Sequence, residues 1–257
     1  MNSKNIIIIT GASAGIGLEF ALQIDTAFTN IDEIWLVARR KERLTELAKV
    51  MVHKTKLICM DVTDEYALDL FESLLEEANV TVRMLINAAG FGLLGSFEDI
   101  PLEEQLDMVS VNCQALTKMT YITLPYMKKE SRIIQMSSSA AFLPQPDFAV
   151  YAATKSYVLS FSRALNKELA KDKIYVTAVC PGPVNTEFFD IAEQYGRTLA
   201  IKKLTMITTE QCVDCAIKAS YKKQDIAVPG IPMKAFWLAT KIFPQEIILR
   251  LSTKLKA

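Results

Sequence analysis

The chain has 257 residues, of which 51% are hydrophobic, and its 29 lysines and arginines are balanced by 29 aspartates and glutamates. This length suits one α/β domain with a large core. Nucleic-acid-binding proteins have an excess of basic residues, and this balance argues against that class. No stretch reaches the ~18 uncharged apolar residues of a membrane span. Because the apolar run at 6–9 is also too short for a signal segment, we expect a cytoplasmic protein.

The first elements predict a nucleotide-binding turn. Residues 5–10 are an apolar, β-branched run typical of a strand buried on both faces, and 15–28 are expected to form a helix. The turn between them contains three glycines in a GxxxGxG spacing. Glycines let the backbone approach a pyrophosphate closely, and a helix N-terminus attracts its charge. A plain strand-to-helix turn is the alternative. The expected cofactor contacts are Gly11, Ser13, Gly15, Ile16 and Gly17.

The second predicted strand, at 33–38, ends in Ala38 and is followed by Arg39 and Arg40. In dinucleotide folds an acidic residue near this position binds the ribose 2′-hydroxyl, whereas an arginine accommodates a 2′-phosphate. Alanine does not repel a phosphate, and a guanidinium binds it in a fork. We therefore predict NADP(H) over NAD(H), and we expect Arg39→Ala to lower the affinity for NADPH. The alternative is that the two arginines only solvate the end of the strand.

Strand and helix signals alternate along the rest of the chain. This alternation predicts a single domain, 1–257, with a Rossmann-type, doubly wound parallel sheet covered by helices on both faces. Ligands of such sheets bind beyond the carboxyl ends of the strands. The further expected strands are 55–60, 82–87, 131–137, 173–180 and 225–229, and the helices are 41–53, 64–78, 102–129, 149–171 and 208–222.

Tyr151 and Lys155 are four residues apart, so on a helix they share one face. A tyrosine alone is a poor acid–base group at neutral pH, because its pKa is near 10. A neighbouring ammonium favours the phenolate and lowers that pKa by about 1–3 units. The pair therefore indicates proton transfer to or from a carbonyl or alcohol oxygen. Taken alone, an exposed tyrosine and lysine on a helix would be the simpler interpretation.

Several segments, in order along the chain, resemble the short-chain dehydrogenase/reductase family. Thr10 to Gly17 resembles the family's TGxxxGxG motif, and residues 87–90, Asn-Ala-Ala-Gly, resemble its NNAG motif with Ala88 in place of the second asparagine. Residues 181–186 resemble its PGxVxT motif, and Ser138 precedes Tyr151 by the usual thirteen residues. The resemblance extends the expected cofactor site by Asp61, Val62, Asn87, Gly90, Tyr151, Lys155, Pro181, Gly182, Val184 and Thr186.

The resemblance also implies a catalytic tetrad. Tyr151 is expected to be the general acid in reduction and the general base in oxidation, and Lys155 to lower its pKa and hold the nicotinamide ribose. Ser138 is expected to hydrogen-bond the substrate oxygen. Asn112 is expected to position Lys155 and a proton-relaying water. Without the resemblance, the serine would simply be a polar strand end and the asparagine a polar residue inside a helix.

Histidine and cysteine usage narrows the chemistry. The one histidine, His53, is expected to be a surface or capping residue near the end of the second helix. A single histidine in such a place excludes Ser-His-Asp hydrolysis and histidine-based zinc catalysis. Cys59 and Cys180 lie in apolar strand-like runs, where buried thiols are ordinary. Cys212 and Cys215 form a CxxC in a helical pattern without a second ligand pair, so we interpret them as helix cysteines and predict no metal site.

The substrate is the least determined part. The resemblance implies that residues 140–148 and residues 187–195, within the substrate-loop region 186–207, line the pocket. Its apolar walls favour a hydrophobic ketone, aldehyde, acyl chain or sterol-like compound. These segments contain no cluster of arginines or lysines that would bind a carboxylate, a phosphate or coenzyme A, which argues mildly against 3-oxoacyl thioester substrates. The expected apolar residues, several of which could equally pack the core, are Phe91, Phe142, Leu143, Phe148, Phe188 and Phe189.

The C-terminal extension, 231–257, alternates apolar clusters with lysine and arginine, and Pro244 divides it into two short amphipathic pieces. A homodimer or homotetramer interface, or a pocket lid, is the favoured interpretation. Peripheral membrane contact through a basic amphipathic helix and packing on the chain's own core are the alternatives.

Together these features predict an NADP(H)-dependent carbonyl reductase that acts on a small hydrophobic substrate. An NAD-linked alcohol dehydrogenase and a 3-oxoacyl thioester reductase are the enzymatic alternatives. A nucleotide-sensing or scaffold protein that lost catalysis is the non-enzymatic one, although such a protein needs no tyrosine–lysine pair.

Overall fold

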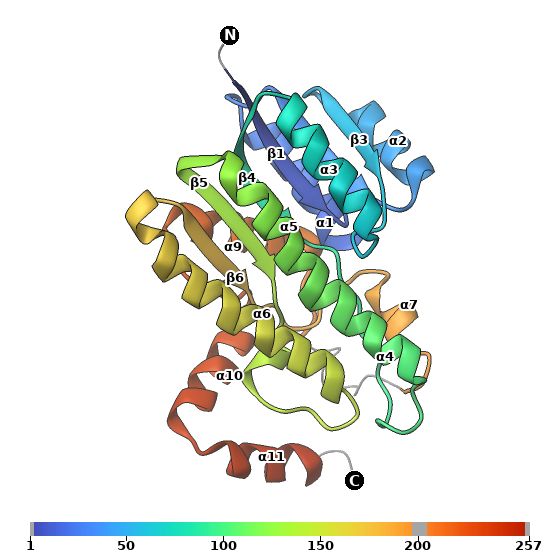
Figure 1. The fold of residues 1–257 in the computed structure, drawn as a ribbon. Coiled ribbons are helices and arrows are strands. Elements are labelled where there is room, and N and C mark those ends of the chain that lie inside the picture. Colours follow the sequence, from blue (N-terminus) through green and yellow to red (C-terminus); the bar gives the residue numbers. More distant parts are fainter. Residues whose placement is uncertain (1–2, 197–204, 255–257) are drawn as a thin grey trace.

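The computed structural model describes residues 3–196 and 205–254, and its centre is a parallel β-sheet (Figure 1). Seven strands of the described chain pair in the order β3-β2-β1-β4-β5-β6-β7. Strands β2 and β3 therefore lie on one side of β1, and β4 to β7 lie on the other, as in a doubly wound fold. The strands are β1 Lys4–Thr10, β2 Glu33–Ala38, β3 Thr55–Cys59, β4 Val80–Asn87, β5 Met127–Met136, β6 Tyr175–Val179 and β7 Ile226–Ala227.

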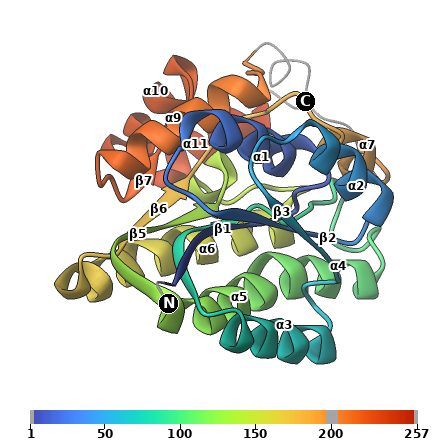
Figure 2. The same cartoon turned by 90° about the horizontal axis from the view of Figure 1, so that it is seen from above.

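Helices cover both faces of this sheet (Figure 2). Helices α1, α2 and α9 pack on one face around Phe20 and Leu44, and α3, α5 and α6 pack on the other around Phe71 and Met119. The helices are α1 Gly15–Ala27, α2 Lys41–Val50, α3 Glu65–Glu77, α4 Leu102–Val109, α5 Leu116–Thr123, α6 Ala149–Glu168, α7 Phe188–Ala192, α9 Thr209–Tyr221, α10 Ile231–Ile242 and α11 Gln245–Lys254. The predicted fold class is confirmed.

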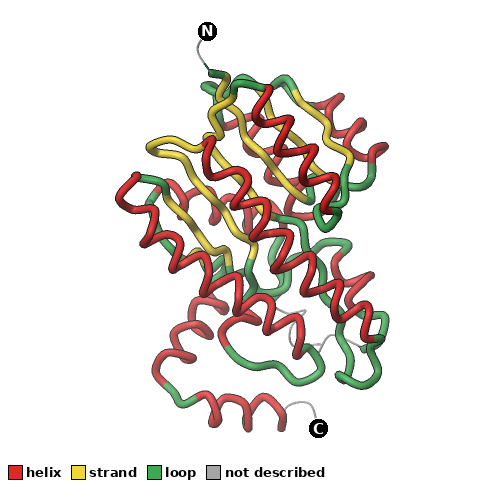
Figure 3. The backbone as a smooth tube through the Cα atoms, in the orientation of Figure 1, coloured by secondary structure: helices red, strands yellow, loops and turns green. Residues whose placement is uncertain are grey.

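The apolar strands explain why the sheet is buried. The four isoleucines of β1 at positions 6–9 are at most 1% exposed, and every residue of β2 is buried. Side chains alternate between the two faces of a strand, so a run without polar residues serves two cores at once. Because the strands are parallel, the loops that follow them all begin at the same end of the sheet (Figure 3).

The predicted helix 102–129 is wrong in two respects. It contains a π-helical segment, Ser110–Ala115, between α4 and α5, and it ends at Thr123 because Pro125 is followed by the start of β5 at Met127. Proline restricts the backbone before it and donates no hydrogen bond, so the helix stops there. The second helix ends at Val50, three residues before the predicted boundary.

Glu33 at the start of β2 carries a buried ion-pair cluster. Its carboxylate accepts hydrogen bonds from Lys54 Nζ at 2.8 Å, Lys4 Nζ at 3.2 Å and Trp35 Nε1 at 3.2 Å. Burial alone would raise the pKa of Glu33, but these three donors outweigh it and lower the pKa to about 2. The carboxylate therefore stabilises the fold above its unfolded pKa of 4.5, and this contribution is lost as pH falls towards about 2.

We expect Glu33→Gln to lower the free energy of unfolding at pH 7 by about 1–2 kcal/mol, a value reduced for the exposure of both lysines. Urea unfolding at pH 7 and at pH 2 measures it, and the difference from the wild type should shrink at the lower pH. Glu65→Gln is the matched control, because Glu65 also pairs with a lysine, Lys118, but is fully exposed. Equal effects of the two variants would contradict the buried-cluster interpretation.

Candidate active site

The turn after β1 forms a cradle of bare backbone. Gly11 has φ +69°, and a Cβ there would lie 2.8 Å from the backbone nitrogen of Ala89. A Cβ on Gly17 would lie 2.2 Å from the carbonyl oxygen of Gly11. These contacts leave no room for side chains and bring the N-terminus of α1, which begins at Gly15, against the loop after β4. The cradle and its free N–H groups fit the pyrophosphate of a dinucleotide, as the spacing predicts.

Arg40 connects the end of β2 to this cradle. Its Nε and Nη2 atoms donate to Ser13 Oγ at 3.2 and 3.1 Å, and its Nη1 lies 3.3 Å from a Glu187 carboxylate oxygen. Glu187 also accepts a 2.7 Å bond from Arg43. Arg39 points elsewhere, with a side chain 77% exposed, and it pairs only loosely with Asp61 at 3.3 Å. Of the two predicted arginines, Arg40 is therefore the one beside the glycine turn.

Asp61 and Val62 directly follow Met60, at the carboxyl end of β3. Val62 is buried, whereas the Asp61 carboxylate accepts hydrogen bonds from the backbone and hydroxyl of Thr63 at 2.9 and 2.7 Å. Partial burial raises the pKa of Asp61, but these bonds and Arg39 outweigh it and hold the pKa below its usual value. Asp61 is therefore a fixed, ionised acceptor on the same edge of the sheet as the glycine turn.

The loop after β4 is held by two motif residues, Asn87 and Thr10, and by side chains outside the motifs. Asn87 is buried, and its Nδ2 donates to Gln135 Oε1 at 2.9 Å and Thr120 Oγ1 at 3.1 Å. Thr10 Oγ1 accepts from the backbone nitrogens of Ala88 and Ala89 at 3.1 and 3.2 Å. The backbone at position 88 thus keeps its anchor although alanine replaces the family's asparagine.

Asn112 lies in the π-helical segment and is completely buried. Its carboxamide clamps the loop after β4: Oδ1 accepts from Phe91 N at 3.2 Å, and Nδ2 donates to Phe91 O at 2.9 Å and to Thr154 Oγ1 at 3.0 Å. A π-helical turn inside an α-helix often marks a functional position. The expected contact with Lys155 is indirect, since both Asn112 Oδ1 and Lys155 Nζ border the space above Gly90, 2.7 and 3.3 Å from a Cβ built there.

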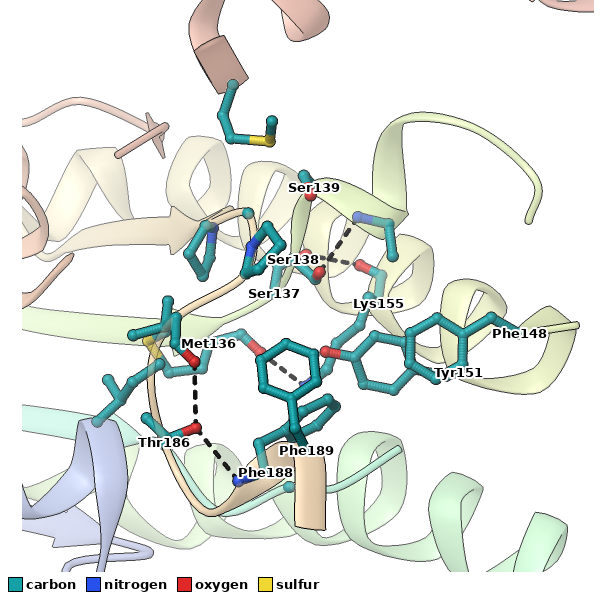
Figure 4. Close-up of a pocket in the computed structure, with 18 of the residues that line it drawn as sticks. Met136, Ser137, Ser138, Ser139, Phe148, Tyr151, Lys155, Thr186, Phe188 and Phe189 are labelled. Atoms are coloured by element: carbon teal, nitrogen blue, oxygen red, sulfur yellow. Dashed lines mark hydrogen bonds between the residues drawn. The ribbon is translucent and has the colours of Figure 1, made fainter. Parts of the chain in front are cut away.

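Tyr151, Lys155 and Ser138 meet at one side of a cavity (Figure 4). Tyr151 and Lys155 lie one turn apart on α6, both buried, and Lys155 Nζ is 5.5 Å from the centre of the Tyr151 ring. Lys155 Nζ donates to the carbonyl oxygen of Met136 at 3.0 Å, which ties α6 to the end of β5. Ser138 follows β5, and its hydroxyl is hydrogen-bonded to Tyr151. The structure brings together the three residues that the sequence suggests.

The pKa values differ from the sequence-based expectation. Burial raises the pKa of Tyr151 to about 12, and the hydrogen bond with Ser138 only partly opposes this. Burial lowers the pKa of Lys155 to about 8, against the opposing effect of the Cys113 and Cys180 thiols. Burial is thus the main influence on the pKa of Tyr151 in the protein alone, and the Lys155 ammonium, 5.5 Å from the ring centre, is not among the groups that lower it.

The cavity has a volume of about 470 Å³ and mostly apolar walls. Phe148 stacks on the Tyr151 ring at 4.2 Å, and Phe188 is tilted against it at 5.6 Å (Figure 4). Of the six expected apolar residues, Phe148, Phe188 and Phe189 line this cavity. The other three fit the alternative of packing elsewhere: Phe91 packs beside the Tyr151 cluster, and Phe142 and Leu143 border a second cavity next to α11.

Two cavity residues, Met233 and Phe236 of α10, are missing from the sequence-based prediction. They lie more than 80 residues after Tyr151, and their helix contacts the turn after β5 through a Phe142–Phe236 ring contact at 6.3 Å. A Cβ on Gly182 would meet the Met233 sulfur at 2.6 Å. A pocket lid is one sequence-based interpretation of the C-terminal extension, although that interpretation does not single out these two residues, and their place on the cavity wall fits it.

The PGxVxT-like segment closes the other side of the cradle. Pro181, Gly182, Val184 and Thr186 all line the cavity. Thr186 Oγ1 accepts from Phe188 N at 3.2 Å at the start of α7, and a Cβ on Gly15 would meet its methyl group at 3.2 Å. Part of the predicted substrate-loop region, residues 197–204, lies outside the described residues.

Two further expectations need correction. His53 lies beyond α2 and is not simply a surface residue: its ring Nδ1 is 2.9 Å from Asp25 Oδ1, on a mostly buried side chain. Cys59 is exposed, because β3 is an edge strand, whereas Cys180 is buried as expected. Cys212 and Cys215 lie on α9, where the pattern placed them. Among the described residues no group of three or more histidine, cysteine or acidic side chains is arranged to hold a metal.

Comparison with known proteins gives consistent matches. The sequence model of the family described as short chain dehydrogenase matches residues 5–195. A very-long-chain 3-oxoacyl-CoA reductase of Laccaria bicolor is 35% identical over 66% of this chain and 52% of its own, so the chain spans about half of that relative.

Among solved structures, a short-chain dehydrogenase from Sphingobium yanoikuyae in complex with NADPH is 28% identical with a TM-score of 0.78, covering 92% of both chains. The fold is also shared by a 3-ketoacyl-(acyl-carrier-protein) reductase from Brucella melitensis complexed with NADH. That protein is 24% identical with a TM-score of 0.73, over 88% of this chain and 96% of its own.

Proposed function

Because the chain belongs to the short-chain dehydrogenase family of oxidoreductases, we propose that it is an NADP(H)-dependent reductase of a hydrophobic ketone or aldehyde. The observation that carries the proposal is the position of three polar groups, from Tyr151, Ser138 and Lys155, at the wall of a mostly apolar cavity. A pocket with few convergent polar groups binds an apolar molecule and orients its one reacting oxygen.

In this proposal Tyr151 donates the proton that turns a carbonyl oxygen into an alcohol. Its pKa of about 12 keeps the hydroxyl protonated at neutral pH, which is the form that reduction requires. With a pKa of about 8, Lys155 is mostly charged at pH 7, so its ammonium stabilises the phenolate that remains. Ser138 hydrogen-bonds the same oxygen and stabilises the charge that develops there.

The cradle between Gly11 and Gly17 would hold the pyrophosphate of the cofactor, and Arg40 would hold its 2′-phosphate. The Arg40 guanidinium already bonds Ser13 of this turn and a carboxylate of Glu187, so it favours an anion at this position. The nicotinamide would supply the hydride. The other predicted cofactor contacts that follow strands lie at the carboxyl ends of β3, β4 and β6, on the same side of the sheet as the glycine turn, which supports one continuous cofactor site.

The acyl-thioester alternative has a specific observation in its favour. The relative from Laccaria bicolor is named for a very-long-chain 3-oxoacyl-CoA, whose chain is apolar and whose reacting group is a ketone. The apolar walls of the cavity suit such a chain as well as a free ketone. We keep 3-oxoacyl thioester reduction as the second candidate, and an NAD-linked alcohol dehydrogenase and a nucleotide sensor as the remaining ones.

Absorbance at 340 nm tests the proposal. The protein is assayed with NADPH and, in parallel, NADH against apolar ketones, aldehydes, diketones and 3-oxoacyl thioesters. We expect turnover with NADPH on at least one apolar carbonyl, and faster turnover than with NADH. Activity restricted to thioesters would select the second candidate, and a preference for NADH would refute the cofactor proposal. Tight NADPH binding without turnover on any compound would favour the sensor.

A further inference from the structure

Helix α10 has two apolar faces, and only one of them is covered. On the inner face Met233 and Phe236 line the active-site cavity. On the outer face the chain exposes Ile231 to 83%, Leu238 to 53% and Ile242 to 64%. These three positions and the exposed Ala235 follow the spacing i, i+4, i+7, i+11, which places them in one stripe along the helix.

The outer stripe continues beyond α10. Phe243, in the turn after it, is 55% exposed, and Ile247 on α11 is 50% exposed. Gln245 and Leu249 of α11 border a second cavity of about 520 Å³ against the loop after β5. Figure 1 shows both helices at the end of the molecule beyond the carboxyl ends of the strands. The stripe therefore lies on the surface at this end of the molecule, next to the active-site cavity.

The charge of this region indicates what covers the stripe. The whole chain has no net charge, but residues 231–257 contain five basic residues, Lys234, Lys241, Arg250, Lys254 and Lys256, and one acidic residue, Glu246, for a local net charge of +4. Lys234 and Lys241 are exposed on α10 itself, seven residues apart beside the stripe. Two such surfaces would repel each other in a symmetric dimer, whereas an anionic surface attracts them.

We propose that α10 and α11 dock this protein on an anionic lipid surface. Ile231, Leu238, Ile242, Phe243 and Ile247 would enter the boundary between head groups and acyl chains, and Lys234 and Lys241 would contact the anionic head groups. No helix in the described part of the chain is long and apolar enough to cross a membrane, so the contact is peripheral. Since the inner face of the same helix lines the cavity, an apolar carbonyl dissolved in the lipid would reach Tyr151 past α10; this last consequence alone rests on the proposed function.

Vesicle flotation with the full chain tests the docking. We expect binding to vesicles of phosphatidylcholine and phosphatidylglycerol, and little binding to phosphatidylcholine alone. Lys234→Glu/Lys241→Glu should weaken binding by at least about 25-fold, at about fivefold per lost lysine charge. Leu238→Ser/Ile242→Ser should weaken it by at least about tenfold, because less apolar surface enters the boundary. Thermal melting shows whether each variant remains folded.

Val52→Ser/Leu70→Ser is the matched control, because Val52 and Leu70 are 84% and 54% exposed outside the C-terminal extension. The control should bind vesicles as the wild type does. Absence of wild-type binding to anionic vesicles, or equal binding by all variants, overturns the proposal. So does a dimer, seen by sedimentation without vesicle binding, that Leu238→Ser/Ile242→Ser dissociates. None of these readouts needs cofactor or turnover, so failure here is distinguishable from failure of the reductase proposal.

Discussion

Tyr151→Phe is expected to lower kcat by about 10²–10⁴-fold, the usual contribution of a positioned acid, while the affinity for NADPH changes little. The variant removes one oxygen atom from a ring that is stacked on Phe148 and packed against Phe188. Because this apolar packing is retained, the loss reports the proton transfer and not the shape of the cavity. Steady-state kinetics on the substrate found by the panel and a fluorescence titration with NADPH measure the two quantities separately.

Tyr157→Phe is the matched control for this experiment. It makes the same chemical change on the same helix, but the Tyr157 hydroxyl is bonded to Thr117 at 2.9 Å on an exposed side of α6. We expect near wild-type turnover from it. If Tyr151→Phe kept most of its activity, or if the two variants lost activity equally, Tyr151 would not be the proton donor and the mechanism proposed above would fail.

Much of the fold could be predicted because its strands are apolar and its turns carry glycine. The runs at 6–9 and 34–37 are apolar at every position and pack on both faces of the sheet, a pattern that does not occur in a half-exposed strand. Boundaries were less certain where tertiary structure decides them. The helix expected to continue to 129 stops at Thr123, and β5 begins at Met127 because it pairs there with Val82 of β4. Pro125 is a local signal for the end of the helix, whereas the pairing that begins β5 depends on a distant strand and leaves no local signal.

The candidate site was predictable to the extent that its residues lie close together in the sequence. Tyr151 and Lys155 share a helix turn, and the glycine turn is continuous, so their spacing together with the family resemblance predicted both. The partners that fix their geometry come from other elements: Thr154 and Phe91 hold Asn112, and the Met136 carbonyl holds Lys155. The pKa values of Tyr151 and Lys155 also depend on packing, because burial shifts both of them more than any neighbouring charge does.

The two arginines after β2 illustrate the same distinction, and they lead to the second large expected effect. Both follow Ala38, and from the sequence Arg39 is the residue on which the NADP(H) prediction depends. In the structure Arg40 reaches Ser13 of the glycine turn, whereas Arg39 is 77% exposed and contacts Asp61. A strand alternates its side chains, so neighbouring residues at its end leave in different directions.

We expect Arg40→Ala to weaken NADPH binding by about 10–100-fold, the value of a charge-assisted fork to phosphate, and to leave NADH binding nearly unchanged. Arg39→Ala is the matched control and should alter either affinity by less than about threefold, in keeping with an exposed ion pair. Fluorescence titrations of both variants with both cofactors measure the effects. A larger loss from Arg39→Ala would transfer the phosphate contact to Arg39, and equal affinities of the wild type for NADPH and NADH would remove the basis for NADP(H) specificity. Glu187→Gln adds an independent check: because its carboxylate occupies Arg40 and Arg43, its neutralisation should strengthen NADPH binding if a phosphate competes for the same guanidinium group.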